Sequence, residues 1–240
     1  MARRLDQQPR QGLGLEQLLQ QVSRVPHLLR AADRAVESRA RDVSLLGIVH
    51  EFREVEVALK SSVGPIPLSS TSETQGMVFA DPKQHPSLQP YLACLERDFG
   101  HAMTFPSFDV ANIYMLYWSA LLLLRMSLLD LERLAARRGD LAASAALRDC
   151  NLKADCTEGG TLLCRSISFL LRKAGGNISQ AASVSAPLHL AEQCFAKLGM
   201  TLQLGCIQAV TAEMRSHFRL LNWEALLPWS FLALLWRATE

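Results

Sequence analysis

The sequence lacks the motifs that identify most enzymes, metalloproteins and exported proteins. It contains no Gly-x-Ser-x-Gly elbow, no phosphate-cradling P-loop, no aspartate-rich motif and no paired Glu-x-x-His segments of a di-iron site. No Cys-x-x-Cys pair occurs either, although a tetrahedral zinc ion usually needs neighbouring thiolates. We therefore assign no catalytic residue, no cofactor-binding residue, no cofactor and no metal ligand from the sequence, and we predict that the chain is not an enzyme.

The sequence also lacks an excess of charge of one sign. Its 25 lysines and arginines nearly balance 23 aspartates and glutamates, which leaves a net charge of +2. Residues 1–14 form a short basic tail with Arg3, Arg4 and Arg10, and this tail has no apolar core of a secretory signal. Because nucleic-acid-binding proteins usually gather basic residues on one face, we expect no direct sequence-specific DNA binding from this chain alone.

The sequence also lacks the alternation of apolar and polar residues that is typical of β-strands. Apolar residues recur instead at helical spacing, and a hydrophobic fraction of 49% can fill a sizeable core. This pattern predicts an all-α fold in which residues 15–240 form a single helical domain of about seven to ten helices. The expected helices cover residues 15–40 with a kink or break at Pro26, 44–60, 109–138 with Asp109 as N-cap and Gly139 as stop, 140–150, 160–176, 186–199, 207–221 and 223–238.

Residues 61–107 interrupt the helical pattern. This segment is rich in proline and serine and includes the polar run SSTSET at 69–74. Because proline has no backbone N–H and breaks helices, we predict a long irregular connection with one short helix around residues 88–97.

The most apolar stretch is IYMLYWSALLLLRMSLLDLE, residues 113–132. A membrane span needs about 20 mainly apolar residues, but the uninterrupted run ends at Arg125. An arginine at the centre of a bilayer costs about 2.5–3.5 kcal/mol, so we expect a buried central helix and no membrane partner. Its aromatic residues Tyr114, Tyr117 and Trp118 either pack in the core or line a cavity for an apolar ligand.

Several isolated polar residues are candidate metal ligands or general bases. His50 and Glu54 stand one turn apart in HEFRE, but a zinc protease would need a second histidine at position 54. We expect a charged outer helix face there, and reduced thiols and surface histidines elsewhere. The residues concerned are Cys94, Cys150, Cys156, Cys164, Cys194, Cys206, His85, His101, His189 and His217, of which His189 has the most apolar surroundings.

Four helical segments follow one another in a familiar order. LLQQVSRVPHLLRAADRA (18–35) is followed by YWSALLLLRMSLLDLE (117–132), LCRSISFLL (163–171) and APLHLAEQCFAKLGM (186–200). Together they resemble the fungal-specific transcription factor domain, the regulatory region of zinc binuclear cluster (Zn2Cys6) transcription factors. Each segment is an ordinary amphipathic helix, so their order and spacing across most of residues 15–225 carry the resemblance.

The resemblance implies a nuclear regulatory domain that controls transcription of a fungal metabolic gene cluster, here one of secondary metabolism, through protein partners. Those partners would be the transcription machinery or a DNA-binding regulator, with a small-molecule effector as a further candidate. The family's DNA-reading module needs six cysteines near the N-terminus, but Cys94 is the only one before Cys150, so we expect the zinc cluster to be lacking. The alternative is a cofactor-free helical enzyme or ligand-binding protein recruited from this scaffold in a biosynthetic pathway.

Overall fold

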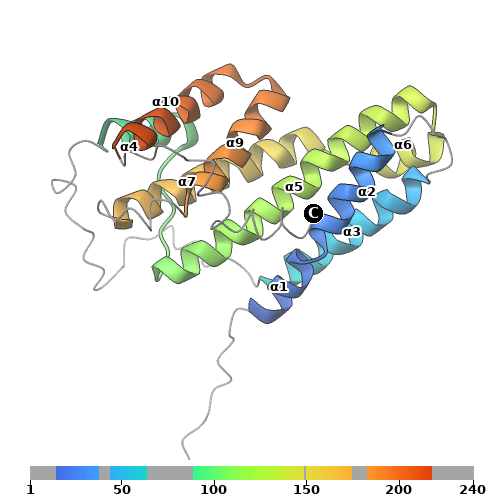
Figure 1. The fold of residues 1–240 in the computed structure, drawn as a ribbon, viewed down its shortest axis with the longest axis horizontal. Coiled ribbons are helices and arrows are strands. Elements are labelled where there is room, and N and C mark those ends of the chain that lie inside the picture. The colour runs from blue at the N-terminus through green and yellow to red at the C-terminus, as the bar shows by residue number, and fades with distance from the viewer. Residues whose placement is uncertain (1–14, 38–43, 64–88, 149, 175–182, 218–240) are drawn as a thin grey trace, which may run out of the picture.

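The computed structural model describes residues 15–37, 44–63, 89–148, 150–174 and 183–217 (Figure 1). These residues form helices and connecting loops and contain no strand, which confirms the all-α prediction. The helices are α1 (Leu15–Val22), α2 (Val25–Glu37), α3 (Leu45–Ser62), α4 (Gln89–Phe99), α5 (Phe108–Arg138), α6 (Leu141–Arg148), α7 (Leu152–Ala174), α9 (Ser185–Leu198) and α10 (Thr201–His217).

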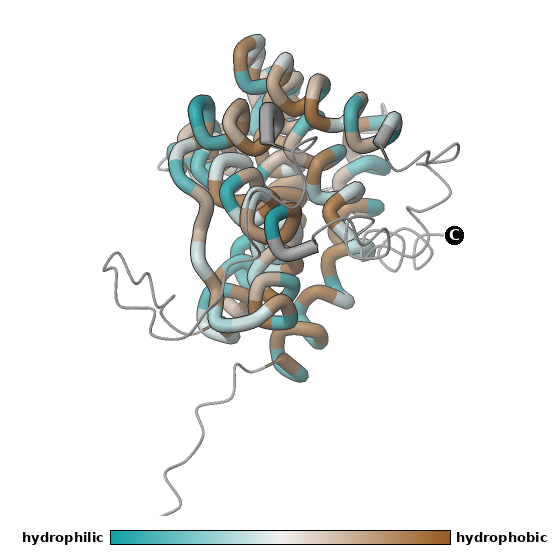
Figure 2. Tube along the Cα trace, turned by 90° about the vertical axis from the view of Figure 1, so that its left-hand side faces the viewer, coloured by the Kyte–Doolittle hydropathy of each residue, from teal (hydrophilic) through white to brown (hydrophobic). Residues whose placement is uncertain are grey.

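The long helix α5 divides the other helices into two groups (Figure 1). An N-terminal group of α1, α2, α3 and α6 packs along one side of α5, and a C-terminal group of α4, α7, α9 and α10 lies on the other. Hydrophobic and hydrophilic residues alternate along most of these helices in Figure 2, as expected for helices with one buried side.

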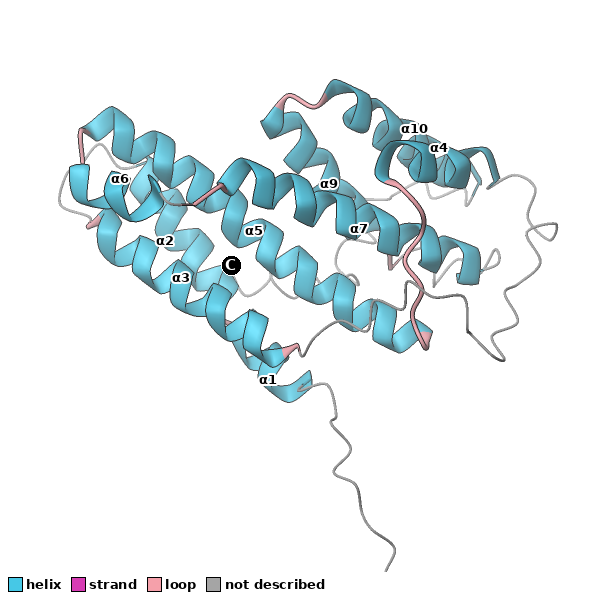
Figure 3. Cartoon of the chain, turned by 180° about the vertical axis from the view of Figure 1, so that it is seen from behind, coloured by secondary structure: helices cyan, strands magenta, loops and turns pink. Residues whose placement is uncertain are grey.

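The helix α4 belongs to the C-terminal group out of chain order. It precedes α5 in the chain, yet it packs against α7 and α10, which come after α5. The loop of residues 100–107 then carries the chain past α7 to the start of α5 (Figure 3). The short helix predicted within 61–107 is therefore part of the core of the C-terminal group.

Both ends of α5 are set by side-chain and backbone caps. The Ser107 hydroxyl oxygen accepts a hydrogen bond from the Val110 amide at 3.2 Å, so Ser107 is the N-cap. The predicted N-cap, Asp109, was wrong and lies inside the first turn, where its charge favours the helix dipole. Gly139 ends the helix as predicted, with a φ of 68° that glycine adopts without strain.

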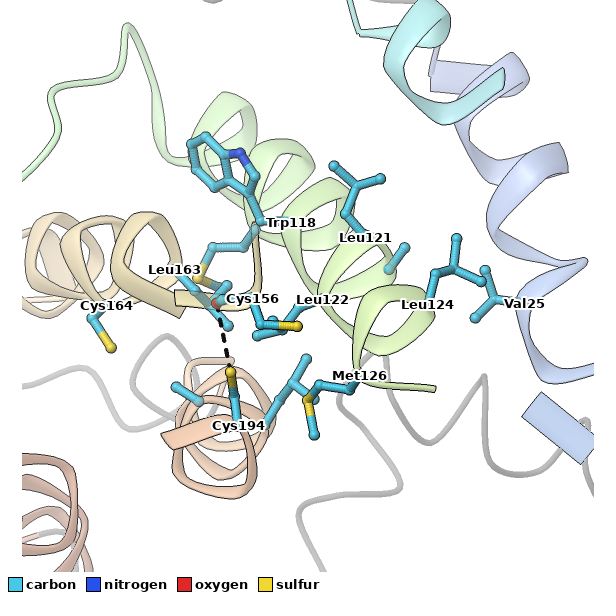
Figure 4. Close-up of a cluster of buried hydrophobic side chains, with 14 of the residues drawn as sticks. Val25, Trp118, Leu121, Leu122, Leu124, Met126, Cys156, Leu163, Cys164 and Cys194 are labelled. Carbon is cyan, nitrogen blue, oxygen red and sulfur yellow. Dashed lines mark hydrogen bonds between the residues drawn. The ribbon is translucent and has the colours of Figure 1, made fainter. Parts of the chain in front are cut away.

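Opposite sides of α5 are buried together. Leu122 and Leu124 point in roughly opposite directions because a helix turns once in about 3.6 residues, and both are fully buried. Figure 4 shows Leu122 beside Cys156 of α7, while Leu124 points toward Val25 of α2. Among the described helices, α5 alone is long and apolar enough to cross a membrane, but 67% of its apolar window is buried, as in the core helix of a soluble protein.

Two adjacent glycines lie inside α7, where the sequence predicted the helix to begin. The helix starts at Leu152 and continues through Gly159 and Gly160. A Cβ atom on Gly160 would lie 2.8 Å from Cζ of Phe195, so the missing side chain lets α9 approach α7 closely.

The remaining helices agree with the predicted pattern apart from their ends. Pro26 is the second residue of α2, so the predicted break separates α1 from α2. The helix α10 begins at Thr201 rather than at residue 207. The basic tail 1–14, most of the Pro/Ser-rich segment (64–88) and the predicted helix 223–238 lie outside the described residues.

We expect Gly160→Ala to lower the free energy of unfolding by about 1–3 kcal/mol, because its methyl group would overlap the buried ring of Phe195. Gly205→Ala in α10 is the matched control, since a Cβ atom there meets nothing within 4 Å. That control is expected to stabilise the protein by about 0.4–1 kcal/mol. Urea denaturation followed by circular dichroism measures both, and equal changes would contradict the close contact.

Candidate functional site

A buried ion pair joins the two helix groups at α5. Arg125 of α5 and Glu56 of α3 are 8% and 2% exposed, and Nε of Arg125 lies 3.2 Å from Oε1 of Glu56. Nη1 of Arg125 also donates a hydrogen bond to the backbone carbonyl of Asp155 in α7, at 3.0 Å. The guanidinium of Arg125 therefore links α5 to two other helices, α3 and α7, and the charge that ends the apolar run of α5 is satisfied inside the fold.

Two further cations complete the surroundings of Glu56. Arg53 Nη1 lies 2.7 Å from Oε2, and Lys60 Nζ lies 3.0 Å from Oε1. Burial alone raises the pKa of the Glu56 carboxyl, but the hydrogen bond from Lys60 and the charges of Lys60, Arg125 and Arg53 together lower it below its ordinary value. Glu56 is therefore ionised at neutral pH.

A cavity of about 260 Å³ lies between α4, the loop 100–107 and α7. The loop is attached to α7 by Arg165, whose Nε donates to the carbonyl of His101 at 2.8 Å and whose own carbonyl accepts from the amide of Met103 at 3.2 Å. An ion pair between Arg172 and Glu96 closes one side. The lining residues are Glu96, His101, Ala102, Met103, Thr104, Phe169 and Arg172.

An aromatic cluster connects this cavity to α5. The ring of Phe169, which lines the cavity, meets that of Phe105 edge-on with centroids 5.2 Å apart. Phe105 in turn lies 5.7 Å from Tyr114 and 6.2 Å from Trp118. Tyr114 and Trp118 are each 2% exposed, so they pack in the core, and Phe169 is the aromatic residue that reaches the cavity.

The structure also brings together a set of metal-ligating side chains that the sequence did not suggest. The sulfur atoms of Cys94 and Cys206 and a carboxylate oxygen of Asp98 all lie within 4.8 Å of one another. Cys94 and Asp98 are one turn apart on α4, and this spacing is the only signal that the sequence contains. Cys206 comes from α10, 112 residues from Cys94, so no local pattern could have found it.

His50, Glu54 and His189, which the sequence singles out, are not gathered into a site. His50 and Glu54 lie on the exposed side of α3, where Glu54 pairs with Arg24 at 3.8 Å. His189, despite its apolar neighbours in sequence, is exposed on α9 and lies 3.0 Å from the Gln193 amide.

Cys150, Cys156 and Cys164, which are neighbours in the sequence, are likewise dispersed. Cys156 and Cys164 are fully buried on α7, whereas Cys150 lies before that helix and contacts the guanidinium of Arg53. Cys156 pairs instead with α9, because the Cys194 thiol donates to its carbonyl at 3.5 Å (Figure 4). His101 is exposed at the cavity, and the side chains of His85 and His217 lie outside the described ones.

Comparison with protein-family models, with curated proteins and with solved structures found no match for this chain. The resemblance to the fungal-specific transcription factor domain, the nuclear localisation and the protein partners therefore stay predictions. Only the sequence pattern and the geometry of the chain itself bear on its function.

Removing the buried guanidinium is expected to destabilise the fold. Arg125→Met should lower the free energy of unfolding by about 1–3 kcal/mol, because the buried Glu56 carboxylate and the Asp155 carbonyl would each lose a hydrogen-bond donor, although two other cations still neutralise Glu56. Arg133→Met is the matched control on the same helix, since Arg133 is 47% exposed and its pair with Asp130 spans 3.6 Å. That control should cost less than about 1 kcal/mol. Urea denaturation distinguishes the two, and a small loss for Arg125→Met would show that the pair is dispensable.

The ion pair between Arg125 and Glu56 should also make the free energy of unfolding depend on pH in the acid range. Because the folded-state pKa of Glu56 lies below its ordinary value of 4.5, its contribution is complete above that value and is lost as the pH falls through the folded pKa. Glu56→Gln cannot lose a charge there. The stability difference between the wild type and Glu56→Gln should therefore shrink from about pH 5 downward, as measured by urea midpoints at a series of pH values. A difference that is constant with pH would contradict this assignment.

Proposed function

We propose that this chain is a helical regulatory domain that controls transcription in the nucleus through protein partners. The observation that carries the proposal is the order and spacing of the four family-like segments, which fall on α1 and α2, α5, α7 and α9. Those helices are in mutual contact through α5, so the four segments belong to one core.

The absence of a six-cysteine module from these residues directs the proposal toward partners. The thiols of Cys156, Cys164 and Cys194 are buried within the helical core, as expected of packing residues rather than of a zinc cluster that reads DNA. Promoter contact would then come from a DNA-binding regulator or from the transcription machinery, with this chain bound to it. Genes of a fungal secondary metabolite cluster are the proposed targets.

The cavity beside α4 supports a small effector. Its volume of about 260 Å³ falls below the roughly 300–1,000 Å³ of pockets for drug-sized ligands, so only a compact molecule would fit. Arg172 and Glu96 supply charged groups at its edge, and Met103 and Phe169 supply apolar ones. A ligand-binding or enzymatic role in a biosynthetic pathway is the second candidate, and it rests on this same cavity.

A reporter assay with the protein tethered to DNA distinguishes the regulatory function from the enzymatic or ligand-binding one. The whole chain fused to a heterologous DNA-binding domain is expected to change transcription of a reporter that carries the matching sites several-fold. The fusion with Gly160→Trp is the negative control, because a large side chain at Gly160 would collide with Phe195 and disrupt the core. An unchanged reporter, together with altered metabolites but unaltered transcripts in cells that lack the protein, would favour the enzyme or ligand-binding candidate.

A further inference from the structure

Two thiols from distant parts of the chain face each other between α4 and α10. The Sγ atoms of Cys94 and Cys206 lie 2.9 Å apart. Cys206 is 5% exposed, whereas Cys94 is only half-buried and can be reached from solvent. The remaining described cysteine pair, Cys156 and Cys194, is fully buried, so Cys94 with Cys206 is the thiol pair there that a dissolved oxidant can reach.

The Asp98 carboxylate lies beside both members of this pair, within 4.8 Å of each sulfur atom. The Cys94 thiol donates a weak hydrogen bond to the Asp98 carboxylate at 3.8 Å, and Nη2 of Arg97 lies 3.5 Å from the Cys94 sulfur. Burial raises the pKa of the Cys206 thiol, and the nearby Asp98 carboxylate adds to this effect, so Cys206 keeps its proton. The two sulfurs are thus suited to different steps, because the solvent-accessible Cys94 meets a dissolved oxidant first and the buried Cys206 reacts second.

We propose that Cys94 and Cys206 are a redox pair that a peroxide converts to a disulfide between α4 and α10. Hydrogen peroxide, the co-reactant, transfers one oxygen atom to the Cys94 sulfur and releases one water, which leaves a sulfenic acid. The Cys206 sulfur then bonds to the Cys94 sulfur, and the sulfenic hydroxyl departs as a second water with the Cys206 proton. The two thiols together lose two electrons and the peroxide gains them, and a dithiol reductant reverses the change.

A metal ion at the same three side chains is the competing interpretation, and Arg97 argues against it. Nε and Nη2 of Arg97 bond to both carboxylate oxygens of Asp98, at 2.7 and 3.0 Å. Those hydrogen bonds hold the pKa of the Asp98 carboxyl below its usual value and use one lone pair on each of its oxygens, so fewer remain for a metal. The same guanidinium places a positive charge beside the position of the cation, which disfavours metal binding.

The disulfide would act on the cavity as well as on the helices. It would connect positions 112 residues apart and fix α4 to α10. Because α4 also carries Glu96, which lines the cavity, oxidation would hold one cavity wall in place. This inference does not depend on the proposed role in transcription.

Peptide mapping of the full-length protein tests the proposal directly. Trypsin releases Cys94 in residues 84–97 and Cys206 in residues 198–215, each as the only cysteine of its peptide. After treatment with hydrogen peroxide and alkylation of free thiols, we expect these two peptides to appear linked, with a mass lower by two hydrogen atoms than their sum, and to separate on reduction. The oxidised protein should also unfold at a higher urea concentration than the reduced protein.

Variants define the controls and the contrary results. Cys94→Ser and Cys206→Ser should each abolish the linked peptide, and Cys150→Ala should retain it because Cys150 lies elsewhere, at the start of α7. Circular dichroism confirms that each variant is folded. Two free thiols after peroxide treatment of the wild type would overturn the proposal. So would stoichiometric zinc binding that both serine variants abolish in a protein that forms no disulfide, since this would identify a metal site instead.

Discussion

A helix that carries leucine on opposite sides has to be covered on both, because each leucine left in water forfeits about 1.5–3 kcal/mol. In α5, Leu122 and Leu124 impose this requirement, and the N-terminal and C-terminal groups meet it from opposite sides. Arg125 is a buried charged residue of the same helix, and its hydrogen bonds go to Glu56 on one side and to the Asp155 carbonyl on the other. Leucine packing holds the groups together, and the directional bonds of one arginine fix how they are placed around α5.

Local chemistry made most of the fold predictable from the sequence. Apolar residues at helical spacing located α3, α5 and α9, and left-handed glycines at Gly139 and Gly199 ended two of these helices where expected. The errors have local causes too. The sequence predicted a helix boundary at Gly159 and Gly160, because glycine weakens an isolated helix by about 1 kcal/mol. In the folded protein the helix continues through both glycines, where it packs closely against Phe195 of α9.

The polar groups of interest could not be predicted in the same way, because each joins residues far apart in the chain. Glu56 and Arg125 are 69 residues apart, and Cys94 and Cys206 are 112 apart. In the sequence, Arg125 argued only against a membrane span, and nothing in the residues around it indicates which carboxylate pairs with it. No pair of neighbouring cysteines marks the second site in the sequence, because the packing of α4 against α10 brings those two thiols together.

The position of α4 also has a consequence for the synthesis of the chain. This helix is complete at Phe99, but its partner α10 ends at His217. A ribosome needs about 6–24 s to cover that interval at usual rates of translation. Meanwhile the N-terminal group can assemble on α5. Leu92 and Leu95, which are buried against the C-terminal group in the folded protein, stay exposed to water until that group forms. The nascent α4 is therefore open to chaperones, or to aggregation, for longer than helices that pack on neighbours just made.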